Sequence, residues 1–450
     1  MADTDLIEIA AIDAAAEIAR GAISAENYVR AYLDRIAALE KDVQAFVHLD
    51  PDYALTQARA LDKRRSNGYP IGPLHGIPVA IKDIFDTADF PTGYGSAIYA
   101  GRRPPGDCAA VTRLRAAGAV IIGKTVTTEF AYFHPGKTRN PHDSKRTPGG
   151  SSSGSAAAVA AGMAPLAIGS QTNGSMIRPA AFCGVFGFKP THGTISRAGA
   201  LMLSRALDHV GTFSRRLEDI ALILDVLAGP DAADPDTRPY AAAAFRTTVA
   251  EAPPVKPRFA FIRTPMWVKA DPDAQKKIEQ AAKELGAIDV DLPDDYRAGW
   301  EAQRVIMWTD MAHNLGDNID KGEVSAQFRD LVTEGRKVTA MQYLAALRDA
   351  RRYADGLTDV FKHADAVVTP SARGVAPEGT ATGDPVFCTF WTLTGLPALN
   401  LPILAGEDSM PLGLQLIGER GTDERLLRTA RVLLDRLGSK KSAKLARAAR

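Results

Sequence analysis

Residues 149–193 read GGSSSGSAAAVAAGMAPLAIGSQTNGSMIRPAAFCGVFGFKPTHG, and this stretch begins with the composition of a flexible linker. Apart from Val159, residues 149–162 are all glycine, serine or alanine. The same alanines also favour a thin helix that can pack closely, and the glycines before them permit backbone conformations that other residues avoid. The stretch is therefore either slack chain between domains or part of a site built from its serines.

The bulk composition is that of an ordinary soluble globular protein. The 450 residues are 46% hydrophobic and 24% charged, with a formal net charge of +1. This balance argues against a surface for nucleic acid or for a membrane. Neither an apolar run long enough to cross a membrane nor a secretory signal pattern is present, and three widely spaced cysteines suggest a reducing compartment. We expect a cytoplasmic protein.

Alternating strand and helix patterns predict a layered α/β fold around a largely buried sheet. Short apolar runs indicate strands in IPVAIKDIF, AVIIGKT, FAFIR, AVVTP and LGLQLIG. We expect a single domain over residues 1–450. Its parts are N-terminal helices (1–65), a core (66–229), a variable and mainly helical cover (230–365), a return to the core sheet (366–437) and a basic tail (438–450).

Two stretches match known motifs, but the sequence around them does not fit the structure that each motif requires. Residues 118–125, GAVIIGKT, fit the phosphate-loop pattern, but Ala-Val-Ile-Ile favours a strand over a flexible cradle, and the candidate acidic partner Asp225 falls in a helical pattern. Residues 150–154, GSSSG, fit a nucleophile elbow centred on Ser152. That motif needs an apolar strand just before the serine, whereas the preceding KTRNPHDSKRTPG is polar and turn-forming.

Three features carry chemistry together. Lys82 lies in GIPVAIKDIFD, where a buried lysine needs a partner or a lowered pKa; by itself it could also be a chain-end lysine that reaches water. Ser151 follows a Gly-Gly pair. Ser175 follows Asn173-Gly174, two residue types that readily adopt positive φ. Consecutive backbone N–H groups there could therefore point to one side and bind an oxyanion.

A lysine, then Gly-Gly-Ser-Ser, then a Gly-Ser nucleophile resembles the amidase signature family. Residues 149–193 follow that family's defining stretch almost position by position, and Ser151 and Ser175 have its spacing. GPLHGIPVAIKDIFD upstream and TLTGLPALNLPI with MPLGLQLIG downstream resemble two further blocks of the family. The resemblance implies a layered α/β/α fold with a large mixed β-sheet flanked by helices, and hydrolysis of a small-molecule amide without metal or cofactor.

The resemblance also implies a Ser–Ser–Lys triad. Ser175 attacks the amide carbonyl, Ser151 follows a cis peptide bond and relays the proton, and neutral Lys82 is the general base. The remaining site residues that it implies are Thr172, Asn173 and Gly174, whose amides hold the oxyanion with that of Ser175, and Ser152 and Ser153, which support the network.

Two departures from the common Asp-Thr-Gly-Gly-Ser pattern bear on substrate preference. Gln171 stands where a carboxylate is expected to brace the loop, and Asn173 stands where glycine is commoner. The arginine of the motif also comes one place later, as Arg178.

Three hypotheses for function follow from the resemblance. The first is an amide hydrolase that forms an acyl-enzyme. The second is the glutamine-hydrolysing A subunit of an aminoacyl-tRNA amidotransferase, and the third is a non-catalytic binding protein on the same fold. A homodimer is common in the family. The aromatic residues Tyr132, Phe133, Phe390 and Trp391 are candidates either for an acyl pocket or for the core.

Overall fold

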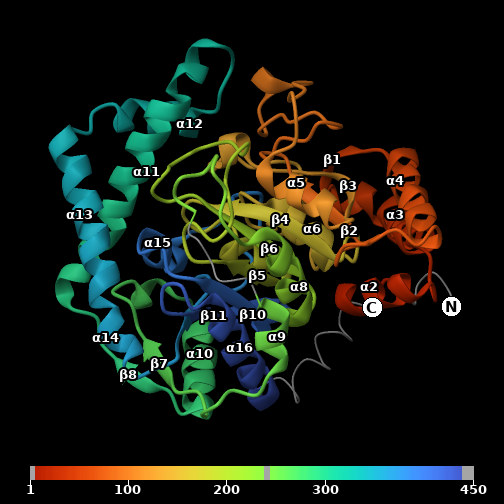
Figure 1. The fold of residues 1–450 in the computed structure, drawn as a ribbon. Coiled ribbons are helices and arrows are strands. Elements are labelled where there is room, and N and C mark those ends of the chain that lie inside the picture. Colours follow the sequence, from red (N-terminus) through yellow and green to blue (C-terminus); the bar gives the residue numbers. More distant parts are fainter. Residues whose placement is uncertain (1–5, 238–243, 438–450) are drawn as a thin grey trace.

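A mixed sheet of eleven strands runs through the molecule (Figure 1). The computed structural model describes residues 6–237 and 244–437, so the expected basic tail at 438–450 lies outside it. The strands are β1 (Phe46–Leu49), β2 (Pro78–Lys82), β3 (Val120–Thr125), β4 (Leu166–Gln171), β5 (Phe186–Lys189), β6 (His209–Ser214), β7 (Phe259–Ile262), β8 (Ile288–Val290), β9 (Ala366–Pro370), β10 (Ala398–Ala405) and β11 (Pro411–Ile417).

The sheet combines parallel and antiparallel pairs, as the family resemblance implies. Its order is β1-β3-β2-β4-β6-β5-β10-β11-β9-β7-β8. Strand β2 runs parallel to β3 and β4, and β7 runs parallel to β8 and β9, whereas the other neighbours are antiparallel. Every residue of β2, β3, β5, β6, β9 and β11 is buried, which explains why β2, β3, β9 and β11 could be recognised from apolar runs rather than from alternation.

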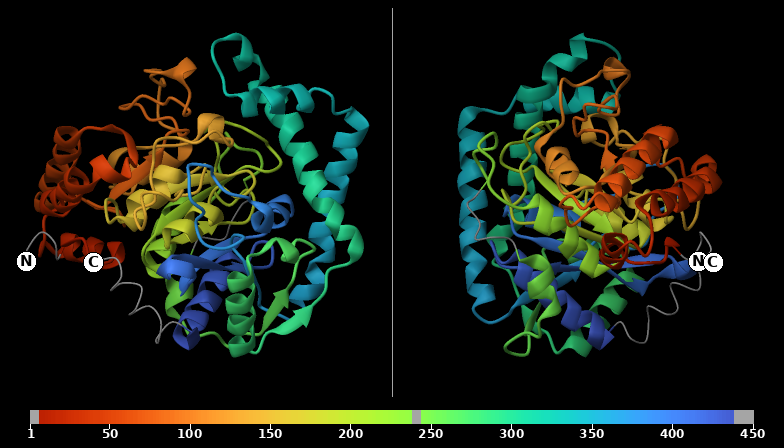
Figure 2. Two further views of the ribbon diagram at one scale, coloured as in Figure 1. Left: turned by 180° about the vertical axis from the view of Figure 1, so that it is seen from behind. Right: turned by 45° about the vertical axis from the view of Figure 1, so that its right-hand side comes forward.

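Helices cover the sheet and extend beyond both of its ends. They are α2 (Ala11–Arg20), α3 (Ala25–Val43), α4 (Pro51–Ser66), α5 (Ala109–Ala116), α6 (Ser153–Ala160), α7 (Ile177–Cys183), α8 (Leu217–Leu227), α9 (Phe245–Ala250), α10 (Pro272–Leu285), α11 (Gly299–Leu315), α12 (Ala326–Gly335), α13 (Ala340–Gly356), α14 (Thr358–Phe361), α15 (Val386–Leu393) and α16 (Asp423–Leu437). Helices α2–α4 lie at the β1 end, and α11–α14 stand at the far side (Figures 1 and 2). No helix of the described ranges is long and apolar enough to cross a membrane.

The N-terminal helices begin and end at the residues that the sequence marks. Gly21 ends α2 with φ +76°, and the Ser24 hydroxyl accepts a hydrogen bond from the N–H of Asn27 at the start of α3. The prediction of helices throughout residues 1–65 is wrong for Phe46–Leu49, which forms edge strand β1 antiparallel to β3. Four residues are too few for a recognisable alternation, so only pairing with β3 defines this strand.

The chain after α8 contains a short helix. Residues 230–256 are rich in Asp, Ala and Pro, and residues 245–250 among them form helix α9. Phe245 and Val249 from this helix are buried, and α9 packs on α8 and α16. Phe245 and Val249 lie four positions apart on one face of α9, and they pack this short helix against the two larger helices.

The stretch that resembles a linker is a buried helix. Helix α6 begins at Ser153, and seven of its eight residues are buried. A Cβ at Gly154 would lie 2.3 Å from the carbonyl oxygen of Ala45 and 2.5 Å from the nitrogen of Val126, so only glycine fits there. Small side chains thus let this helix approach the neighbouring backbone closely, which fixes the position of the serines before it.

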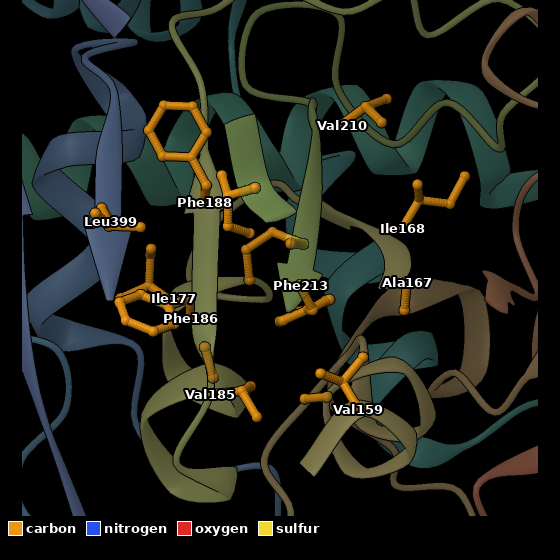
Figure 3. Close-up of a cluster of buried hydrophobic side chains, with 14 of the residues drawn as sticks. Val159, Ala167, Ile168, Ile177, Val185, Phe186, Phe188, Val210, Phe213 and Leu399 are labelled. Atoms are coloured by element: carbon orange, nitrogen blue, oxygen red, sulfur yellow. The ribbon is translucent and has the colours of Figure 1, made fainter. Parts of the chain in front are cut away.

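Beside α6, the middle of the sheet is packed with aliphatic and aromatic side chains (Figure 3). Phe213 of β6 is fully buried, and its ring lies over two glycines of the flanking strands. A Cβ at Gly169 of β4 would come within 2.8 Å of the ring, and one at Gly187 of β5 within 3.3 Å. The glycines therefore make the space that this ring fills.

We expect Phe213→Ala to lower the free energy of unfolding by about 3–5 kcal/mol, because it removes a buried ring and leaves a cavity between two glycines. Urea denaturation followed by circular dichroism measures the change. Val268→Ala is the control, since Val268 is 85% exposed and its truncation should stay within about 0.5 kcal/mol. Equal losses for the two variants would contradict this account of the core.

Candidate active site

Lys82 ends strand β2 and is completely buried. Its Nζ lies 2.7 Å from Ser151 Oγ and 2.8 Å from Ser170 Oγ. Within residues 6–237 and 244–437, no carboxylate oxygen comes within 4.0 Å of this nitrogen. Burial therefore lowers the pKa of Lys82 well below 10.5, while the more distant Asp208 carboxylate opposes part of the shift.

A second buried lysine, on the next strand, has a different environment. Lys124 of β3 is also fully buried, but its Nζ lies 3.1 Å from an oxygen of Asp83 and donates to Thr92 Oγ1 at 2.6 Å. Lys124 therefore has the counter-ion that a buried ammonium group requires. Lys82 has hydroxyl partners instead, which stabilise either of its protonation states.

The Ser151 segment connects Lys82 to the rest of the site. The peptide bond between Gly150 and Ser151 is cis, and Ser151 is 1% exposed. The Ser152 hydroxyl donates to the carbonyl of Ser170 at 3.2 Å and accepts from the N–H of Ser170 at 3.3 Å. The Ser153 hydroxyl donates to the carbonyl of Val126 at 3.3 Å. Ser152 and Ser153 thus tie the start of α6 to β4 and to the residue that follows β3.

Ser175 lies in the turn between β4 and α7, directly beside this segment. Two contacts join them: Arg178 Nη2 donates to the carbonyl of Gly150 at 2.7 Å, and Ser152 Oγ lies 3.9 Å from Met176 Sδ. Ser175 is half-buried, and its hydroxyl makes no hydrogen bond to the part of the chain that the structure describes. Its oxygen therefore remains available to a substrate.

The backbone before Ser175 presents free N–H groups. The carbonyl of Thr172 accepts from Gln303 Nε2 at 3.1 Å, that of Asn173 from Thr392 Oγ1 at 2.5 Å, and that of Gly174 from the N–H of Arg178 at 3.0 Å. The N–H groups of Asn173, Gly174 and Ser175 donate to none of the described residues. Occupied carbonyls beside unoccupied N–H groups are the arrangement that an oxyanion requires.

Gln171 braces this turn in place of the carboxylate of the common pattern. Its Oε1 accepts from the N–H groups of Met176 at 2.7 Å and Ile177 at 3.0 Å, at the start of α7. Its Nε2 donates to Thr392 Oγ1 at 2.8 Å. One amide side chain therefore accepts on one side and donates on the other, which a carboxylate cannot do.

The neighbouring side chains secure the turn from further away. Thr172 Oγ1 donates to Asp208 at 2.6 Å, and this carboxylate also accepts from the N–H groups of Leu203 and Ser204. Burial raises the pKa of Asp208 to about 6 in spite of these bonds. Asn173 Oδ1 accepts from Thr389 Oγ1 at 2.7 Å. The turn is therefore held by groups on three separate segments.

Sequence reasoning missed five of these residues: Ser170, Asp208, Gln303, Thr389 and Thr392. Ser170 carried a local signal, because it alternates with Gln171 at the end of a strand and so points to the opposite face. The contacts of Gln303, Thr389 and Thr392 with the turn span 130 to 221 positions, and no spacing in the sequence reveals them.

The candidate aromatic residues divide between the core and the edge of the site. Phe390 and Trp391 are completely buried, and Phe390 stacks on Trp300 with ring centroids 5.2 Å apart. Phe133 is half-buried, with its ring 5.9 Å from the Arg178 guanidinium carbon. Among the described residues, no group of three histidine, cysteine or acidic side chains is placed to hold a metal ion.

Comparison with known proteins gives a consistent result. The family model described as Amidase matches residues 27–427. Among relatives, the A subunit of glutamyl-tRNA(Gln) amidotransferase from Chloroflexus aurantiacus is 36% identical in an alignment 472 positions long that covers 94% of this chain and 96% of that protein.

Solved structures agree with this assignment. Native peptide amidase from Stenotrophomonas maltophilia is 32% identical, with a TM-score of 0.84 over 96% of this chain and 97% of that one. A chain from a vestigial complex, linked to the evolutionary origins of an s-triazine catabolic enzyme, is also 32% identical, with a TM-score of 0.89 over 95% and 98%.

We expect Gln171→Ala to lower the free energy of unfolding by about 1–3 kcal/mol, because it leaves the N–H groups of Met176 and Ile177 buried without a partner. Gln280→Ala is the matched control, since Gln280 is exposed and bonds only to Glu284 on the same helix. Urea denaturation of both variants measures the difference. A loss for Gln171→Ala no larger than for the control would mean that Gln171 is not the brace.

Proposed function

Because this chain belongs to the amidase family and is a hydrolase of carbon–nitrogen bonds, we propose that it cleaves a carboxamide into a carboxylate and ammonia or an amine, through an acyl-enzyme on Ser175. The observation that carries the proposal is the environment of Lys82. A completely buried amine 2.7 Å from Ser151 Oγ, without a counter-ion in the described chain, has a lowered pKa and in its neutral form is suited to accept a proton.

The proposed reaction moves one proton along Ser175, Ser151 and Lys82. Neutral Lys82 takes the proton of the Ser151 hydroxyl as Ser151 takes that of Ser175, and Ser175 Oγ bonds to the carbonyl carbon. The carbonyl oxygen of the substrate becomes an oxyanion. The free N–H groups of Asn173, Gly174 and Ser175 bind it, together with that of Thr172 by analogy with the family. The proton then returns through Ser151 to the nitrogen, and the C–N bond breaks.

The second half of the proposed reaction releases the acid. Water loses a proton to the same Ser151–Lys82 pair and attacks the acyl carbon, and the bond to Ser175 Oγ breaks as this oxygen regains a proton. The pair therefore serves as base and then as acid in each half.

A second function is supported by the relatives. The similarity to the A subunit of glutamyl-tRNA(Gln) amidotransferase covers nearly the whole of both chains, which favours a protein that hydrolyses glutamine and passes ammonia to a partner. Gln171 and Asn173 depart from the pattern usual for such subunits, so we rank it second. A panel of amides that includes glutamine, scored for ammonia with and without partner proteins, separates the two functions.

A fluorophosphonate probe tests the nucleophile without knowledge of the substrate. We expect labelling of Ser175, its loss in Ser175→Ala, and slower labelling in Lys82→Ala, because the hydroxyl then lacks its base. With a turned-over amide, Ser175→Ala should lower kcat by at least about 10⁴-fold. Mass spectrometry of the labelled peptide identifies the site.

Ser66→Ala is the control, since Ser66 is exposed at the end of α4 and should leave the labelling of Ser175 intact. Labelling of Ser152 instead of Ser175 would overturn the assignment of the nucleophile. Absence of labelling in a folded sample would favour a protein that only binds or one that needs a partner.

We expect kcat/KM to rise with pH and to level off once Lys82 is deprotonated, because only the neutral amine accepts a proton. Burial lowers the pKa of Lys82, so the plateau begins well below the pH at which an ordinary lysine titrates. Asp208→Asn removes the charge that raises this pKa, and the acidic limb should move to lower pH. An unchanged or raised limb in that variant would contradict the role given to Lys82.

A further inference from the structure

Arg178 is a buried cation without an anionic partner in the described chain. It is 2% exposed, and its Nη2 donates to the Gly150 carbonyl at 2.7 Å. Nε and Nη1 are buried as well, but neither has a hydrogen-bond partner. Burial lowers the pKa of Arg178 to about 10, so the guanidinium still carries its charge at neutral pH.

This charge lies between the two serine segments of the site. Arg178 follows Ser175 by three positions, in the first turn of α7. Its Nη1 lies 3.1 Å from the position that a Cβ would take at Gly174, so the guanidinium lies against the turn that offers the free N–H groups. Its Nη2 bonds to the residue that precedes Ser151. The unpartnered N–H groups are therefore next to the place where a substrate must bind.

The protein itself does not neutralise this group. Asp384 is the carboxylate that acts on it electrostatically, but Asp384 accepts from the N–H of Val386 and forms no ion pair with Arg178 within 4.0 Å. By contrast, Arg197, which is also largely buried, pairs with Asp234 at 2.7 Å and with Asp236 at 2.6 Å. A buried cation without such a partner is costly unless an anion from outside completes the site.

We propose that the unpartnered N–H groups of Arg178 bind a carboxylate of the substrate, so that the preferred substrates are short amides with a carboxylate a few bonds from the scissile carbonyl. This inference rests on the proposed amide hydrolysis and adds its substrate class. A guanidinium favours a carboxylate because both groups are planar and their hydrogen bonds are charge-assisted. An uncharged amide of equal length leaves these N–H groups buried without a partner, and the site rejects it.

The test compares amides of matched length. Succinamate is paired with butyramide and glutaramate with valeramide, so that each pair differs by a carboxylate in place of a methyl group. We expect kcat/KM to favour the charged member by about 100-fold, and Arg178→Met to reduce this ratio at least 10-fold. Arg178→Lys keeps the cation and should retain part of the preference. The ratio within one variant is insensitive to a general loss of catalytic power.

Two controls separate recognition from net charge and from folding. Arg263→Met removes an arginine that pairs with Glu279 and Asp289 at the surface, and the ratio should not change. Succinate and glutarate should protect Ser175 from the fluorophosphonate in the wild-type protein at concentrations where butyrate does not. This measurement keeps the test valid if Arg178→Met fails to fold or if none of the four amides is turned over.

Equal kcat/KM within both pairs would overturn the inference. Equal protection by butyrate and succinate would also overturn it, because it would mean that the N–H groups of Arg178 bind the carboxylate formed by the reaction rather than a second carboxylate of the substrate. The inference would also be overturned if neither succinate nor glutarate protected Ser175. If Ser175 is labelled but no charge preference appears, only the substrate class fails. If a folded sample shows no labelling, the proposed hydrolysis itself fails.

Discussion

The site depends on one buried amine that is held by hydroxyl groups. Lys82 ends a central strand and is completely buried, and Ser151 and Ser170 are its polar partners at 2.7 and 2.8 Å. An ammonium group in such a place is unfavourable without a carboxylate, so the sheet favours the neutral amine. Every other part of the site is arranged around this constraint: the helix that presents Ser151, the strand that presents Ser170, and the turn that presents Ser175.

The turn before Ser175 couples the sheet to the helical cover. Gln171 holds it from within, Gln303 on α11 binds it from the side of the cover, and Thr389 and Thr392 bind it from α15. The bonds from Gln303 and Thr392 occupy the carbonyl groups of Thr172 and Asn173 and leave the N–H groups of the turn free. The cover, whose sequence carries little signal, therefore contributes through Gln303 to the geometry of the proposed oxyanion site.

Local patterns predicted much of this molecule, and long-range pairing supplied the rest. The strands that contain Lys82 and residues 120–125 follow from apolar runs, and the alanine-rich stretch forms the thin helix expected beside Ser151. The chemistry of Lys82 could be anticipated because a lysine among aliphatic residues must be paired or neutral. The edge strand at Phe46–Leu49 could not be anticipated, because only its pairing with β3 makes it a strand.

The partners of the turn belong to the same unpredictable class. Asp208, Gln303 and Thr389 are ordinary polar residues in the sequence, and they acquire roles only when the fold brings distant segments together. Gln171 shows the opposite limit, because the sequence placed it in the turn but did not show that an amide could brace the turn. An amide that both accepts and donates replaces the carboxylate, which no comparison of charge alone reveals.

Two buried basic side chains lie in one site, and their acid–base chemistry suits them to different roles. A lysine can give up its proton when it is desolvated, so burial favours the neutral form of Lys82 that the proposed mechanism uses as its base. An arginine keeps its proton, so burial leaves Arg178 as a fixed positive charge that an anion must satisfy. The same low-dielectric surroundings thus make one residue suited to proton transfer and the other to recognition. An arginine in place of Lys82 would keep its proton and could not accept one from Ser151.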